Sequence, residues 1–201
     1  MKVLCPELTK EAITTLAFVT LYENGERSFT FARKTPGADM LLTKDDIDEN
    51  EIRQAKMVHA GSVNMTKEPA RGANLYAMKL AHDNGKLVSF DVNYRDTLWE
   101  NEAACKEVAD QVYDYVDFLK ISEEELYFVG GEENIPAFMK EHGISVVIET
   151  LGADGAKYFF DGHTGHQPGH KVHAVDATGA GDAFLGRFPF QDPHERRHHE
   201  D

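Results

Sequence analysis

Apolar and polar residues alternate along residues 14–22 and 27–33, and this spacing predicts a pair of β-strands. Asn24-Gly25 lies between them and is a turn pair, so the two strands are expected to form a hairpin. Short apolar runs follow and predict buried strands at 56–63, 86–93, 117–122 and 144–152. Helical spacing or helix-start residues between them predict helices at 43–55, 68–85, 99–116, 123–131 and 135–143.

The order of these elements predicts an α/β fold with a largely parallel sheet flanked by helices, after an N-terminal β-hairpin. Thr43 or Asp45 is expected to cap the helix over 43–55. Residues 155–160 and 163–175 are expected to form a second antiparallel hairpin. Cys105 lies within a helical pattern and is expected in the core.

Polar or glycine residues follow each predicted strand, in the segments GSVNM, DVNYR, KISEEE and TLGADG. In open parallel sheets, ligands bind at the carboxyl ends of the strands. The sequence therefore predicts a ligand site built from these four segments.

Charge and composition narrow the class of partner. The 201 residues contain 21 Lys and Arg against 35 Asp and Glu, a formal net charge of −14, which disfavours nucleic acids and anionic membranes. The two cysteines, Cys5 and Cys105, fit neither a disulfide framework nor a CxxC metal site. With no long apolar run or signal-peptide pattern, the expected compartment is the cytoplasm.

The segment VDATGAGDAFLGRF, residues 175–188, carries the clearest chemical pattern. Small residues at a helix start expose backbone N–H groups and the positive end of the helix dipole, which together bind anions. Gly179, Ala180 and Gly181 are therefore candidates for an anion hole, and Asp182 for a general base that accepts a hydroxyl proton. A glycine-rich turn with an aspartate helix cap is the alternative interpretation.

DATGAGD, residues 176–182, resembles the second signature of the PfkB (ribokinase-like) carbohydrate kinases. The resemblance extends in order from about residue 14 to residue 186. FDVNYRDTLW, residues 90–99, resembles a stretch shared by fructokinases and 2-keto-3-deoxygluconate kinases, and LKISEEEL and TLGADG resemble nucleotide-side segments. The sequence around the first hairpin resembles the bacterial fructokinase branch.

The resemblance implies a ribokinase-like fold and a role for each matching residue. Asp182 matches the catalytic base, and Gly179, Ala180 and Gly181 match the anion hole for the γ-phosphate. Glu125 matches the glutamate that organises Mg²⁺ through water, and Asp176 matches a contact to a monovalent cation such as K⁺. The expected nucleotide contacts are Ser122, Glu125, Thr150, Gly152 and Gly155, and the expected substrate contacts are Arg33, Asp91, Asn93 and Arg95.

Residues 1–188 are expected to form part of a PfkB carbohydrate kinase domain, and residues 189–201 a disordered tail outside the family pattern. The family's N-terminal Gly-Gly sugar-binding segment has no match in the chain, and the tail PFQDPHERRHHED has no apolar periodicity.

The function implied is ATP-dependent phosphorylation of fructose to fructose 6-phosphate. The alternatives are a 2-keto-3-deoxygluconate kinase and a catalytically inactive fragment or pseudoenzyme of the same family. The expected ligands are a sugar, ATP and Mg²⁺, with K⁺ as a further candidate. Neither nucleic acid nor membrane is expected as a partner, and a homo-oligomer remains open.

Overall fold

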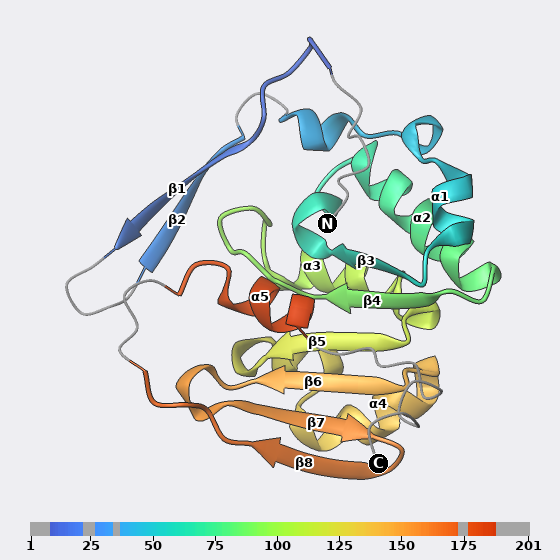
Figure 1. Ribbon diagram of the computed structural model, residues 1–201. Helices are drawn as coiled ribbons and strands as arrows, with labels where there is room; N and C mark the ends of the chain where they lie inside the picture. Colours follow the sequence, from blue (N-terminus) through green and yellow to red (C-terminus); the bar gives the residue numbers. More distant parts are fainter. Residues whose placement is uncertain (1–8, 22–26, 34–36, 173–176, 188–201) are drawn as a thin grey trace, which may run out of the picture.

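A computed structural model describes residues 9–21, 27–33, 37–172 and 177–187 (Figure 1). The predicted turn at Asn24-Gly25, the candidate cation contact Asp176 and the predicted tail lie outside these residues. Two sheets are present in the described part: a two-stranded hairpin and a six-stranded sheet.

The six-stranded sheet positions the site. Its strands lie in the order β3-β4-β5-β6-β7-β8, with β3 to β6 parallel and β7 and β8 antiparallel to their neighbours. The parallel sheet predicted from the strand–helix alternation is therefore confirmed. The strands are β3 (Met57–Gly61), β4 (Leu87–Asp91), β5 (Phe118–Ser122), β6 (Val146–Thr150), β7 (Ala156–Phe160) and β8 (His163–Gln167).

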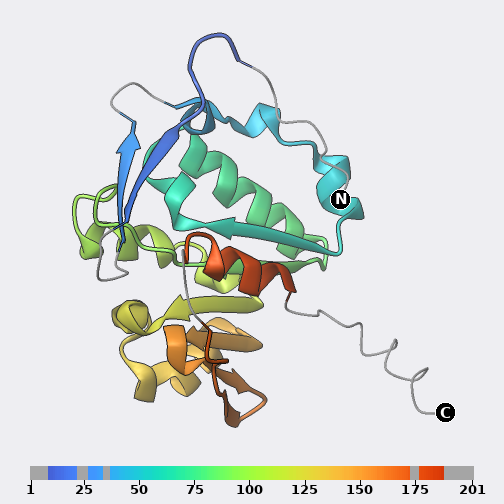
Figure 2. The ribbon, with the colours of Figure 1, turned by 60° about the vertical axis from the view of Figure 1, so that its left-hand side comes forward.

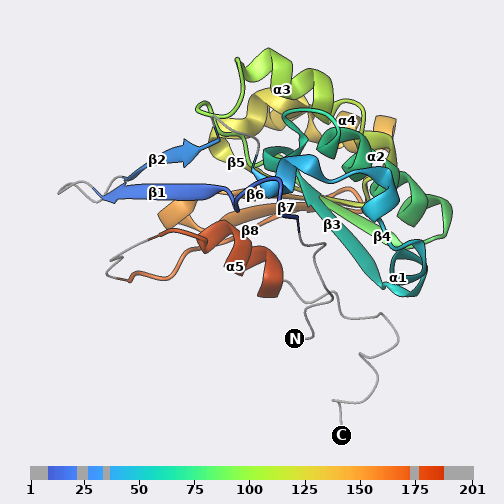
Figure 3. The same ribbon diagram turned by 90° about the horizontal axis from the view of Figure 1, so that it is seen from above.

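Helices cover the two faces of this sheet unequally (Figure 3). On one face lie α2 (Ala70–Asp83), α3 (Glu102–Ala109) and α4 (Ile135–His142), and this side holds the main core, with Phe90, Leu119 and Tyr113 buried. Cys105 is fully buried there, as predicted. The opposite face carries α5 (Ala180–Arg187) over a smaller apolar cluster. No helix in the described ranges is long and apolar enough to cross a bilayer.

The hairpin forms its own small sheet and stands away from the larger one (Figures 1 and 2). Strands β1 (Leu16–Leu21) and β2 (Arg27–Ala32) pair antiparallel, with Phe18 opposite Thr30. The predicted hairpin is confirmed. Several of its apolar side chains face solvent, and Phe18 is 57% exposed.

Two local predictions were wrong. The helix predicted over 43–55 is a 3-10 turn followed by α1 (Glu49–Gln54), and Asp48 caps α1 by accepting from the Asn50 and Glu51 N–H groups. Thr43 caps only the 3-10 turn, and Asp45 lies inside that turn. The helix predicted over 99–116 is α3 alone, because Asn101 caps its start and a 3-10 turn at 113–115 replaces its second half.

Candidate active site

An open cleft of about 590 Å³ lies at the carboxyl ends of β4, β5 and β6, beside the start of α5. Three of the four predicted strand-end segments and the GAGD segment line it. The predicted site residues in its lining are Asp91, Asn93, Arg95, Ser122, Glu125, Thr150, Gly152, Gly155, Gly179, Ala180, Gly181 and Asp182. The fold therefore brings together predicted site residues that lie far apart in the sequence, from Asp91 to Asp182.

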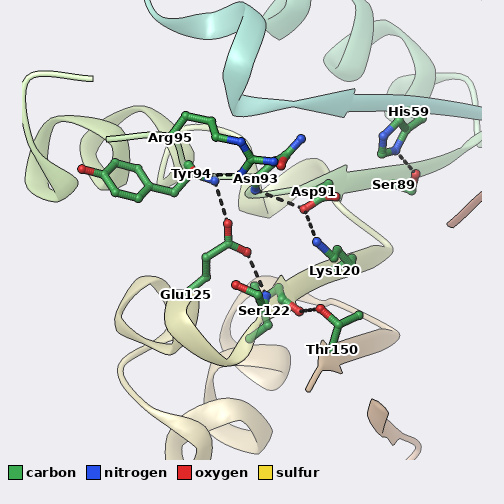
Figure 4. A network of polar contacts seen from close by, with 11 residues as sticks. His59, Ser89, Asp91, Asn93, Tyr94, Arg95, Lys120, Ser122, Glu125 and Thr150 are labelled. Atoms are coloured by element: carbon green, nitrogen blue, oxygen red, sulfur yellow. Dashed lines mark hydrogen bonds and ion pairs between the residues drawn. The ribbon is translucent and has the colours of Figure 1, made fainter. Parts of the chain in front are cut away.

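Glu125 joins two of the strand ends (Figure 4). Its Oε1 accepts a hydrogen bond from the Tyr94 N–H at 2.6 Å, and its Oε2 accepts one from the Ser122 N–H at 2.8 Å. Glu125 is 5% exposed, so both bonds lie out of water, where a charge-assisted hydrogen bond is strongest. The carboxylate thus fixes the segment after β4 against the segment after β5.

Asp91 and Lys120 form a buried ion pair beneath the cleft. They are register partners on β4 and β5, and Lys120 Nζ lies 3.1 Å from Asp91 Oδ1. The Asn93 N–H also donates to Asp91 Oδ1, at 3.1 Å. Burial raises the pKa of Asp91 to about 6, against the opposing effect of the Lys120 ammonium, and the nearby Glu125 charge raises it further. Sequence analysis missed Lys120.

The pKa of Asp91 predicts a pH-dependent contribution to stability. Because the pKa is raised from 3.8 in the unfolded chain to about 6, the folded state binds the proton more tightly. Stability contributed by this group is present below pH 3.8 and is lost as the pH rises through 6. The quantity to compare is the difference in the free energy of unfolding, wild type minus Asp91→Asn. We expect this difference to fall by roughly 3 kcal/mol between pH 3 and pH 7.

Urea unfolding at several pH values measures this difference. The comparison cancels other titrating groups, because they are present in both proteins. A difference that stays flat across this range would contradict the raised pKa.

Arg95 links the hairpin to the cleft. Its guanidinium lies over the Phe29 ring of β2, 5.7 Å from the ring centre, and its Nη1 donates to the Tyr94 carbonyl at 2.7 Å. Phe29 itself lines the cleft. A cation above an aromatic face is attracted by the ring, so this contact holds β2 near the strand ends.

The loop after β6 has a shape that requires glycine. Thr150 Oγ1 donates to the Ile121 carbonyl at 3.3 Å, which fixes the end of β6 to β5. Gly155 has φ +99°, and a Cβ there would lie 2.0 Å from the Gln167 carbonyl oxygen. The chain can make this close turn only without a side chain, so Gly155 shapes the loop that borders the cleft.

The start of α5 faces the cleft. Gly179 has φ +73°, which turns the chain into the helix, and the Ala183 N–H then donates to the Gly179 carbonyl at 2.8 Å. The Ala180 N–H donates to the Ala177 carbonyl at 3.1 Å and is therefore already bonded. An anion at this end of the helix would have to accept hydrogen bonds from the N–H groups of the residues after Ala180. Asp182 lies in the first turn and is exposed.

Arg33 does not line this cleft. Its guanidinium pairs with Asp39 and donates to the Val63 carbonyl at 3.0 Å, so it binds the segment after β3 instead. That segment, GSVNM, is the one predicted strand end that stays out of the cleft lining. The predicted role of Arg33 in binding substrate stays a prediction, as does the predicted contact of Asp176 to a monovalent cation.

The carboxylates that line the cleft are the candidate ligands for the predicted Mg²⁺. Among the described residues, no group of three or more His, Cys, Asp or Glu side chains could hold a metal ion by itself. Both oxygens of Glu125 already accept backbone N–H groups, although each oxygen retains a further lone pair. Glu123 and Glu124, which sequence analysis did not single out, add carboxylates to the cleft lining.

Comparison with known proteins identifies the family. The profile described as pfkB family carbohydrate kinase matches residues 5–188. The chain belongs to this family. Curated relatives include Fructokinase-1 and Fructokinase-2 of Zea mays, which are each 41% identical to this chain, over 179 and 182 residues respectively. These alignments cover 87% and 88% of this chain but 55% and 54% of the relatives, so the chain spans about half their length.

Solved structures agree with the family assignment. Fructokinase from Xylella fastidiosa with bound ATP superposes with a TM-score of 0.79 at 31% identity, covering 89% of this chain and 56% of that one. A fructokinase double mutant from Vibrio cholerae O395, in a fructose-, ADP- and potassium-bound form, gives 0.74 at 30% identity, covering 85% and 56%. The predicted ribokinase-like α/β fold is therefore confirmed.

Proposed function

We propose that this chain carries the phosphoryl-transfer site of an ATP-dependent fructose kinase. One observation carries the proposal: a single cleft collects the strand-end segments, the glycine-rich start of α5 and Asp182. Phosphoryl transfer needs positioning, positive groups around the phosphates and an acceptor for the sugar hydroxyl proton. Relatives named fructokinase, at about 40% identity, favour fructose as the sugar.

In the proposed reaction, a fructose hydroxyl oxygen attacks the γ-phosphorus of ATP. The new O–P bond forms as the bond from the γ-phosphorus to the β,γ-bridging oxygen breaks, and ADP leaves with that electron pair. Asp182 accepts the hydroxyl proton, because its carboxylate is exposed at the cleft. The N–H groups at the start of α5 stabilise the negative charge on the transferring oxygens.

The predicted nucleotide contacts Ser122, Thr150, Gly152 and Gly155 would border the phosphates and ribose from the β5 and β6 ends. Mg²⁺ would supply charge neutralisation between the phosphates, and the carboxylates of the Glu123–Glu125 turn would hold it through water. A K⁺ contact from Asp176 stays a prediction.

The sugar is tested by rate measurements on the purified chain. We expect ADP release in the presence of Mg²⁺ to depend on fructose and to be at least tenfold slower with 2-keto-3-deoxygluconate, about the discrimination one well-placed contact gives. A preference for 2-keto-3-deoxygluconate would assign the other branch of the family. A folded chain inactive with both sugars would support the inactive-fragment alternative.

Two further expectations stay predictions. The cytoplasmic location rests on the sequence alone. A homo-oligomer is favoured by the exposed apolar side chains of β1, Leu16, Phe18 and Val19.

A further inference from the structure

Lys120 is a charged residue placed inside an otherwise apolar strand. Its side chain is 7% exposed, and the residues beside it on β5, Leu119 and Ile121, are fully buried. A lysine ammonium has three N–H donors. In the described part of the chain, Asp91 Oδ1 is the hydrogen-bond acceptor found for it. The ammonium also lines the cleft, so it has donors to offer to a ligand there.

The Lys120 ammonium lies between the Asp91 carboxylate and the first turn of α5. The first turn of α5 lies directly over it, since a Cβ on Gly181 would be 3.5 Å from Nζ. The positive end of the helix dipole and the ammonium therefore point into the same space. Asp91 is the one carboxylate paired with the ammonium among the described residues, and its burial raises its pKa.

Among the described residues, the other charged groups nearby do not pair with Lys120. Glu125 is held by two backbone N–H groups, and Asp182 lies exposed on α5. His59 of β3 hydrogen-bonds to Ser89 of β4, with 2.6 Å between Nδ1 and Oγ (Figure 4). An anion with several acceptor oxygens would satisfy both the helix start and the ammonium.

We propose that Lys120 Nζ contacts the γ-phosphoryl group and so makes the site prefer ATP to ADP; this inference rests on the proposed function. Asp91 holds the ammonium in place before the nucleotide binds. Lys120 is not the base in the proposed reaction, because the sugar proton goes to Asp182. Its role is to donate hydrogen bonds to the γ-phosphoryl oxygens while the group moves from ATP to the sugar.

A purely structural role for the pair predicts something different. If Lys120 only joins β4 to β5, its loss lowers stability and weakens ATP and ADP binding alike. If it contacts the γ-phosphoryl group, its loss weakens ATP binding selectively, because ADP has no such group. The ratio of the two dissociation constants therefore separates these roles.

The experiment is calorimetric titration of the full chain with ATP and with ADP, each with Mg²⁺. We expect Lys120→Met to weaken ATP binding at least ~10-fold and ADP binding less than ~2-fold, as loss of a charged hydrogen bond predicts. Lys79→Met is the matched control, because Lys79 is an exposed lysine paired with Asp83 on α2, and we expect it to keep the wild-type ratio.

A second variant covers the case in which Lys120→Met does not fold. Asp91→Asn combined with Lys120→Met removes both buried charges, and we expect this double variant also to lose the preference for ATP. Equal weakening for ATP and ADP, or an unchanged ratio in a folded variant, would overturn the role of Lys120 and leave the proposed function standing. A folded wild type that binds no ATP would overturn both.

Discussion

Replacing Asp182 with asparagine is expected to lower kcat for ATP-dependent fructose phosphorylation by roughly 10²–10⁴-fold, the usual contribution of a general base. The amide has the same size as the carboxylate but cannot accept the hydroxyl proton. Because Asp182 is exposed in the first turn of α5, the substitution leaves the packed core unchanged. We expect the dissociation constant for ATP with Mg²⁺ to change less than ~3-fold, since binding and proton transfer are separate contributions.

Initial rates of ADP release in the presence of fructose measure this effect. Asp161→Asn is the matched control, because Asp161 is an exposed aspartate in the turn between β7 and β8, away from the cleft lining. We expect that control to keep the wild-type rate. A rate for Asp182→Asn within threefold of wild type would exclude Asp182 as the base.

Glu125→Ala is expected to lower the free energy of unfolding by about 3 kcal/mol or more. The substitution removes the acceptor for the Tyr94 and Ser122 N–H groups, and each hydrogen bond to a charged group contributes roughly 1.5–3 kcal/mol. Glu125→Gln is expected to lie between wild type and alanine, because its amide nitrogen cannot accept the second hydrogen bond.

Urea unfolding compares these variants with Glu124→Ala. Glu124 is the exposed neighbour in the same turn, and we expect its loss to change stability by less than ~0.5 kcal/mol. Equal stability of Glu125→Ala and Glu124→Ala would show that the two hydrogen bonds do not hold the strand ends together. The result also decides how nucleotide binding by Glu125 variants is interpreted, since lost structure alone weakens the site.

The parallel sheet and the gathering of the site could be predicted because both follow from local patterns. Apolar runs alternating with helical spacing indicate a parallel sheet, and parallel strands end at one edge. The segments DVNYR, KISEEE and TLGADG therefore reach the same cleft. The segment GSVNM was expected there for the same reason, but its carbonyl at Val63 binds Arg33 instead.

The ion pair of Asp91 and Lys120 could not be predicted, because it depends on the register between β4 and β5. The two residues are 29 positions apart, and no local pattern fixes which residues of two strands lie opposite each other. The one sequence signal was a lysine inside the apolar run FLKIS. A charged residue there needs a partner.

The sequence contains a signal for the structural role of Glu125 that was not among the predictions. Ser122-x-x-Glu125 has the spacing of a capping box, in which the glutamate accepts the N–H of the serine. The resemblance implied a magnesium role for this residue, and the structure adds its two backbone contacts. Its bond to the Tyr94 N–H needed the fold, because it connects two different strand ends.

The most direct test of the account is whether the start of α5 binds the phosphates of ATP. Calorimetric titration with ATP and Mg²⁺ would compare wild type with Gly181→Asp, which places a carboxylate beside Lys120, and with Gly186→Asp on the same helix, where a Cβ would meet no atom within 4 Å. We predict that wild type and Gly186→Asp bind ATP equally and that Gly181→Asp binds at least ~10-fold more weakly, as a like charge at an anion site requires. Equal binding by all three proteins, or no binding by folded wild type, would contradict the account.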